Sequence, residues 1–202
     1  MSYRKEKKIR KVSKNRILIL CEGKTEKVYL EGLRKSFPRQ LQRDISLEIV
    51  QAEHSETITA IKELTNKIKK AKLEKQAFKE SWLIFDDDNR ALNPIFQQLK
   101  KEEIKFVYNS ISLEYWFLLH YKDTTRQFEN ADVVIKELEK DFGAFSKTDP
   151  ELWNKLKPNY EIAEERAIKL RKKHHSSGNT LPSCKPYTNM DELVEVIKSY
   201  NK

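Results

Sequence analysis

The sequence largely lacks the features of secreted, membrane and zinc-binding proteins. The chain of 202 residues has two cysteines, Cys21 and Cys184, which lie far apart without the spacing of a zinc motif. A disulfide framework is therefore not expected, and a reducing cytoplasm is the natural location. No apolar run approaches the ~18 residues of a membrane span, and the run at 17–21 is too short for a signal peptide. We expect a cytoplasmic protein without a membrane partner.

Glycine is also scarce, with four in the whole chain. The triplet Gly23-Lys24-Thr25 looks like the end of a Walker A phosphate loop, but that motif needs another glycine where Leu18 stands. The Walker A interpretation is therefore excluded. Gly23 is instead expected to allow a sharp turn, and Thr25 to cap the helix that follows.

Positive charge outweighs negative charge, and the net charge is +9. Lys and Arg concentrate at residues 4–16, 62–79 and 166–173. This balance favours a polyanionic partner, with nucleic acid as the first candidate. Solvated helix faces would explain the same residues equally well, because charge alone does not identify a partner.

Apolar strand patterns alternate with helical patterns in the first half of the chain. Residues 16–21 form a continuous apolar strand, as expected in a parallel sheet covered on both faces. The alternation predicts an α/β fold, a Rossmann-like parallel sheet flanked by helices. Further strands are predicted at 45–50, 81–85 and 104–108, and helices from Thr25 to the stop at Phe37-Pro38 and at 57–78 and 93–101.

The second half of the chain has mainly helical patterns. In the segment 113–121, Leu113, Trp116 and His120 share a face, so His120 is expected in the core. Further helices are predicted at 131–142, 152–156, 160–174 and 190–200. The length suits one domain: a basic leader at 1–15, an α/β core at 16–125, and a helical C-terminal extension at 126–202 packed on the core.

Acidic residues follow two of the predicted strands. Parallel strands end at the same edge of a sheet, which brings Glu22, Asp86, Asp88 and Asn109 together. Alternation along the strand turns Asp86 and Asp88 to one side and Asp87 to the other. Mg²⁺ (or Mn²⁺) suits such a carboxylate cluster and favours phosphoryl transfer. The acidic run at 86–88 would also suit a solvated loop that caps the next helix.

Glu26 is a further candidate for this site. It lies one helical turn after Glu22, close enough to supply a second carboxylate. An ordinary first-turn acid beside the helix dipole would account for Glu26 equally well.

Three segments together resemble the RloB-like family. They are residues 17–26 (ILILCEGKTE), 85–88 (FDDD) and 108–120 (YNSISLEYWFLLH). The likeness continues towards the C-terminus, where residues 164–173 and 185–197 look like the closing segments of the family. That family is similar to the Toprim fold of topoisomerases, primases and OLD-type nucleases, so the resemblance implies a Toprim-like core.

The resemblance also implies roles for individual residues. Glu22 would be a general acid/base or a residue of the metal shell, and Asp86 and Asp88 would hold Mg²⁺. Glu26 resembles the second glutamate of OLD-type nucleases, and Glu114 would complete the acidic site. Asp87 and Asn89 depart from the more usual basic and acidic neighbours. Association with bacterial defence and restriction loci implies a role in phage defence by abortive infection, with an ATPase or restriction-type partner protein.

Several cations are candidates for binding a nucleic-acid backbone. A solvated helix face would explain those at 166–171 equally well. The candidates are Lys24, Arg90, Arg166, Lys169, Arg171 and Lys185.

Three functions remain open at this point. The first is a Mg²⁺-dependent Toprim-type nuclease acting on RNA, including tRNA, or on DNA. The second is a phosphatase with Asp86 as nucleophile and Asp88 as acid/base, although such motifs normally open their domain. The third is a module that binds nucleic acid or an effector protein without catalysis.

Overall fold

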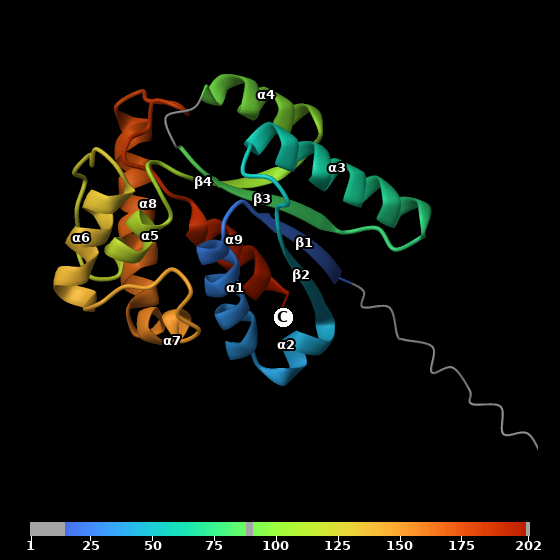
Figure 1. Ribbon diagram of the computed structural model, residues 1–202, viewed down its shortest axis with the longest axis horizontal. Coiled ribbons are helices and arrows are strands. Elements are labelled where there is room, and N and C mark those ends of the chain that lie inside the picture. Colours follow the sequence, from blue (N-terminus) through green and yellow to red (C-terminus); the bar gives the residue numbers. More distant parts are fainter. Residues whose placement is uncertain (1–14, 88–90, 201–202) are drawn as a thin grey trace, which may run out of the picture.

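A four-stranded parallel sheet forms the centre of the computed structural model, which describes residues 15–87 and 91–200 (Figure 1). The strand order is β2-β1-β3-β4. Ile19 of β1 lies between Ile49 of β2 and Trp82 of β3, in register with both. The predicted α/β, Rossmann-like fold is confirmed. The strands are β1 (Asn15–Cys21), β2 (Ile45–Gln51), β3 (Glu80–Asp86) and β4 (Lys105–Asn109).

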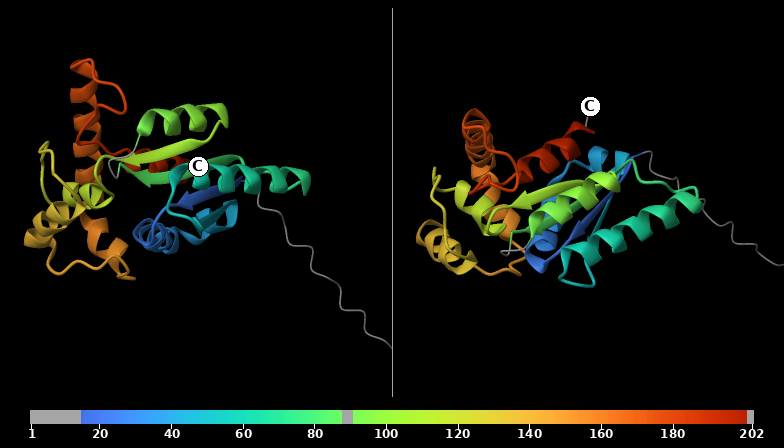
Figure 2. Two further views of the ribbon diagram at one scale, coloured as in Figure 1. Left: turned by 45° about the horizontal axis from the view of Figure 1, so that its top comes forward. Right: turned by 90° about the horizontal axis from the view of Figure 1, so that it is seen from above.

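Both faces of the sheet are buried, which explains the continuous apolar sequence of β1. Ile17 and Ile19 point into one hydrophobic core, and Leu18 and Leu20 into the other. The second core is covered by α3 (Thr57–Leu73) and α4 (Leu92–Lys101). Helices α1 (Lys24–Ser36), α2 (Arg39–Asp44) and α9 (Met190–Ser199) cover the opposite face (Figure 1, Figure 2).

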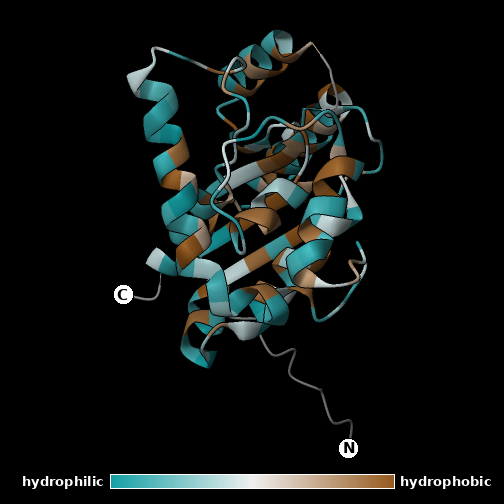
Figure 3. Cartoon of the chain, turned by 90° about the vertical axis from the view of Figure 1, so that its left-hand side faces the viewer, coloured by the Kyte–Doolittle hydropathy of each residue, from teal (hydrophilic) through white to brown (hydrophobic). Residues whose placement is uncertain are grey.

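The remaining helices continue the core on the side of α1. Trp116 and Tyr29 are both fully buried, and the Trp116 indole donates a hydrogen bond to the Tyr29 hydroxyl (3.0 Å). Figure 3 shows hydrophobic residues on the strands and inner helix faces, with hydrophilic residues outside. These helices are α5 (Glu114–Leu119), α6 (Ala131–Phe142), α7 (Leu152–Leu156), the 3₁₀ helix η1 (Lys157–Asn159) and α8 (Tyr160–Ser176).

Three local predictions were wrong or incomplete. Helix α1 begins at Lys24 with Gly23 as N-cap, so Thr25 lies inside the first turn and does not cap it. Helix α3 ends at Leu73, before the predicted Phe78, because its last buried residue is Ala71 and the chain then reverses through Lys75 at φ 57°. The short helix α2 was missed because it buries only Leu41 and shows little periodicity.

The described part of the chain contains no helix that is both long enough and apolar enough to span a membrane. Nearly all of the predicted basic leader, together with Asp88, Asn89 and Arg90, lies outside the described residues.

Candidate functional site

The carboxyl edge of the sheet brings Glu22 and Asp86 to one place. Glu22 directly follows β1, and its backbone N–H donates to the Ile84 carbonyl of the neighbouring strand (3.2 Å). Asp86 is the last residue of β3. Both side chains line a cavity of about 410 Å³.

Four carboxylates from three segments of the chain line this cavity, called here the acidic cavity. Glu26 comes from the first turn of α1, and Glu114 from the first turn of α5. The whole lining consists of Glu22, Gly23, Lys24, Thr25, Glu26, Ser55, Asp86, Ser112, Leu113, Glu114, Ala131, Lys147 and Thr148.

Glu26 is a buried carboxylate with a perturbed pKa. It is buried, and its Oε2 has no hydrogen-bond partner within residues 15–87 and 91–200. Burial raises the pKa of Glu26 to about 7, and the charges of Glu114 and Glu22 add to the effect. Glu26 therefore exchanges its proton near neutral pH.

Gly23 leaves the space that Glu26 occupies. The backbone of Gly23 is extended, with φ −118° and ψ 177°, a conformation open to any residue. A Cβ at this position would lie 2.7 Å from Glu26 Oε2. Glycine is therefore needed at position 23 because Glu26 packs closely against it. The turn that was expected here does not itself require a conformation special to glycine.

Glu22 and Glu114 are held by different neighbours. The Thr57 hydroxyl at the start of α3 donates to Glu22 Oε1 (2.8 Å). Glu114 is buried, and its Oε1 lies 3.5 Å from Nζ of Lys147, whose side chain is 57% exposed. Sequence reasoning missed Lys147 because nothing in the segment between α6 and α7 marks it out; only the fold brings it to the cavity.

The adjacent aspartates at the end of β3 turn to opposite sides. Asp86 faces the acidic cavity, and its Oδ1 accepts a hydrogen bond from Asn109 Nδ2 (3.1 Å). Asp87 is buried elsewhere and pairs with Lys185 (2.5 Å). Asp88 lies outside the described residues.

The acidic cavity has the ligand chemistry of a magnesium site but not a complete preformed shell. Within residues 15–87 and 91–200, no three His, Cys, Asp or Glu side chains are arranged to hold a metal ion. Mg²⁺ often takes only one or two carboxylates and completes its shell with water and phosphate oxygens. The oxygen donors and the unsatisfied Glu26 Oε2 therefore fit such a cation.

The five predicted nucleic-acid-binding cations that the structure describes are not gathered round the acidic cavity. Lys24 lines it and is exposed. Arg166 donates to the Leu119 carbonyl (2.7 Å), and Lys169 pairs with Asp123 (2.8 Å). Two more of these cations pair with acids of the same chain, Arg171 with Asp191 and Lys185 with Asp87. Arg90 lies outside the described residues, and the binding role of all six stays a prediction.

Comparison with known proteins identifies the family of the chain. A family model described as RloB-like protein matches residues 17–197. No curated protein and no solved structure matches the chain. Since the match spans most of the sequence and includes every residue of the acidic cavity, the chain belongs to the RloB-like family.

Proposed function

We propose that the chain is a Mg²⁺-dependent nuclease of the Toprim type that cleaves RNA, including tRNA, or DNA in defence against phage. The observation that carries the proposal is the gathering of Glu22, Glu26, Asp86 and Glu114 round one cavity at the carboxyl edge of a parallel sheet. Crowded carboxylates repel one another, so their proximity is costly unless protons or a cation compensate. Mg²⁺ or Mn²⁺ suits oxygen ligands of this kind.

Asp86 and Asp88 are the proposed ligands of the cation. The end of β3 carries Asp86 into the cavity. Asp88 lies outside the described residues and is proposed on the sequence pattern and the family resemblance. When bound, Mg²⁺ would polarise the scissile phosphate and lower the pKa of the attacking water.

Glu22 and Glu26 are the proposed proton-transfer groups. Glu22 lines the cavity with Asp86 and would accept a proton from the attacking water, while the Thr57 hydroxyl restrains its carboxylate. Glu26, with a pKa raised to about 7 by burial, would donate a proton to the leaving oxygen. Glu114 maintains the negative field that raises the pKa of Glu26.

Nucleic acid is the proposed substrate because the chain has a net charge of +9 and the cavity carries two lysines, Lys24 and Lys147. Each lysine would contact a backbone phosphate next to the scissile one. An ATPase or restriction-type partner protein that controls the activity belongs to the same proposal, on the family resemblance alone.

The test is cleavage by the purified full-length chain. Total cellular RNA and plasmid DNA are incubated with Mg²⁺, Mn²⁺ or a chelator, beside Asp86→Asn. We expect metal-dependent cleavage that falls by more than about 100-fold in Asp86→Asn, because a cation ligand is lost. Glu161→Gln, an exposed acid on α8, is the matched control and should cleave like wild type.

Other outcomes distinguish the alternatives. Nucleic-acid binding that is unaffected by chelator and by Asp86→Asn, without cleavage under any metal condition, would favour a binding module. Hydrolysis of p-nitrophenyl phosphate without cleavage of RNA or DNA would favour the phosphatase. In cells, expression of wild type but not Asp86→Asn should reduce phage plating.

A further inference from the structure

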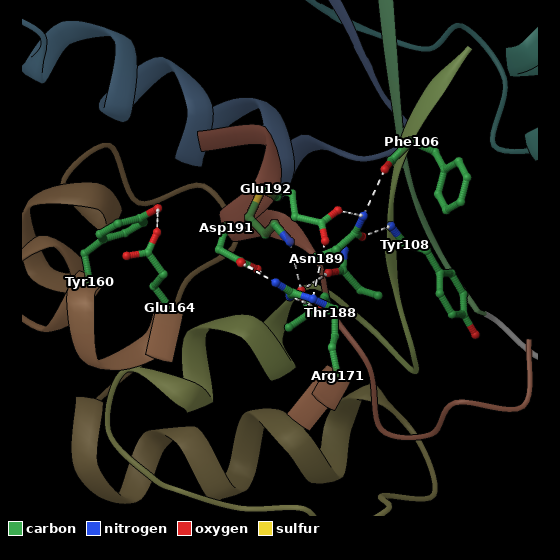
Figure 4. A network of polar contacts seen from close by, with 11 residues as sticks. Phe106, Tyr108, Tyr160, Glu164, Arg171, Thr188, Asn189, Asp191 and Glu192 are labelled. Atoms are coloured by element: carbon green, nitrogen blue, oxygen red, sulfur yellow. Dashed lines mark hydrogen bonds and ion pairs between the residues drawn. The ribbon is translucent and has the colours of Figure 1, made fainter. Parts of the chain in front are cut away.

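Strand β4 lies at the edge of the sheet, and a segment close to the C-terminus, residues 187–189, forms hydrogen bonds along this edge. The Ser110 N–H donates to the Tyr187 carbonyl (2.7 Å). The Asn189 side chain forms two hydrogen bonds with the backbone of β4. It accepts from the Tyr108 N–H (2.9 Å) and donates to the Phe106 carbonyl (3.1 Å) (Figure 4). The segment closes the sheet edge at the strand whose last residue is Asn109.

Thr188 determines which way the Asn109 amide points. Both residues are fully buried and form an antiparallel bridge. The Thr188 hydroxyl accepts from the Met190 N–H (3.3 Å) and donates its single proton to Asn109 Oδ1 (2.8 Å). With Oδ1 engaged as an acceptor, Asn109 Nδ2 faces Asp86 as a donor, at 3.1 Å from its Oδ1.

An ion pair between α8 and α9 holds Thr188 in place. Arg171 donates to the Thr188 carbonyl (2.8 Å) and to both carboxylate oxygens of Asp191 (2.7 and 2.5 Å) (Figure 4). A bidentate arginine pair of this kind is strongly directional. The hydrogen-bonded chain thus runs from Arg171 through Thr188 and Asn109 to Asp86.

We infer that Asn109 and Thr188 are positioning residues that orient Asp86 towards a divalent cation, so that the C-terminal extension is part of the cation site. The inference rests on the proposed function, because it requires Asp86 to bind the cation. An amide N–H that donates to a carboxylate favours its ionised form and restrains its rotation. Such outer partners typically contribute about 10- to 100-fold to metal affinity.

The experiment measures Mn²⁺ affinity of the full chain by electron paramagnetic resonance, without nucleic acid. Thr188→Val keeps the shape of the side chain but removes the hydroxyl that donates to Asn109. We expect about 10- to 100-fold weaker Mn²⁺ binding in Thr188→Val and near wild-type binding in Thr188→Ser. A rescue by serine would show that the hydroxyl is responsible.

The control for general loosening is Asn189→Ala, which removes two hydrogen bonds to β4 but leaves the path from Thr188 to Asp86. Its thermal stability should fall, while its Mn²⁺ affinity stays within about three-fold of wild type. Equal weakening in Asn189→Ala and Thr188→Val, or wild-type affinity in Thr188→Val, overturns the inference alone. Absence of Asp86-dependent Mn²⁺ binding in the wild type overturns the proposed function and the inference together.

Discussion

Two regions of the molecule bury carboxylates in opposite ways. At the junction of α8 and α9, Asp191 is buried against Arg171, which donates to both of its oxygens. In the acidic cavity, Glu26 and Glu114 are also buried, and the lysine that pairs with Glu114, Lys147, is largely exposed. At the junction of α8 and α9, the charge of the buried acid is therefore neutralised by an arginine of the same chain. In the acidic cavity the buried carboxylates are compensated less completely, and this is where we propose that a divalent cation binds.

The largest expected effect on stability comes from breaking the compensated region. Arg171→Met should lower the free energy of unfolding by about 3–5 kcal/mol, because it leaves Asp191 buried without its cation. Urea denaturation measures the loss. The double variant Arg171→Met with Asp191→Leu should recover most of it, since no buried charge then remains. A loss below about 1 kcal/mol in the single variant would contradict the proposed importance of the pair.

In the acidic cavity, neutralising a carboxylate should raise the free energy of unfolding, whereas Arg171→Met lowers it. The pKa of Glu26 is raised from 4.5 to about 7, so the folded state holds a proton that the unfolded state loses. The contribution of Glu26 to the free energy of unfolding is therefore fully present below pH 4.5 and is lost as the pH rises through 7, by about 3–4 kcal/mol at ~1.4 kcal/mol per unit. Glu26→Gln should be more stable than wild type by about this amount at pH 8, and equal to it near pH 4.5.

Urea denaturation at the two pH values, without divalent cations, checks this prediction. Glu161→Gln, exposed on α8, should show no such pH-dependent difference. A Glu26→Gln effect that is the same at both pH values would mean that the proton is not the cause.

His120, in the hydrophobic core, should change stability with pH in the direction opposite to Glu26 in the acidic cavity. Burial lowers the pKa of His120 from 6.5 to about 4, so the folded state keeps the imidazole neutral. The contribution of His120 to the free energy of unfolding is fully present above pH 6.5 and is lost as the pH falls through 4, by at most about 3–4 kcal/mol. His120→Phe should remove this acid-side loss while keeping an aromatic ring against Trp116. Chemical denaturation between pH 4 and 7 tests it, and an unchanged slope would refute it.

The smallest effect is expected at Lys147. Its side chain is 57% exposed, so the pair with Glu114 contributes less than about 1 kcal/mol. Lys147→Met should leave the free energy of unfolding nearly unchanged but raise the pKa of Glu26 further, because Lys147 lowers it. The measurement is the pH dependence of stability in Lys147→Met beside Lys136→Met, an exposed lysine on α6. A lower pKa of Glu26 in Lys147→Met would contradict the assigned effect of Lys147 on this carboxylate.

Much of the fold could be predicted because its signals are local. The apolar run of β1, the alternation in β2 and the helical spacing of α6 each reflect burial of nearby residues, and all three elements lie where predicted. The meeting of Glu22 and Asp86 also followed from sequence, because parallel strands end at one edge. Thr25 was assigned as a cap on residue preference alone, which does not specify where the first helical turn begins.

The other parts of the candidate site depend on contacts between distant segments. Lys147 reaches Glu114 from a loop, and Thr188 reaches Asn109 from the C-terminal segment. Neither contact has a periodic pattern, because a single side chain is brought to its partner by the packing of whole helices. Asp87 is similar: alternation turned it away from Asp86, but only the fold supplied Lys185 as its partner.

Hydrophobic spacing along the chain was therefore enough to specify the parallel sheet and the edge where its acids meet, since burial of each strand and helix is decided by neighbouring residues. The raised pKa of Glu26, the orientation of Asp86 and the pairing of Arg171 with Asp191 arose only on folding. These properties depend on burial and on distances of a few ångströms between residues remote in sequence, which no local pattern encodes.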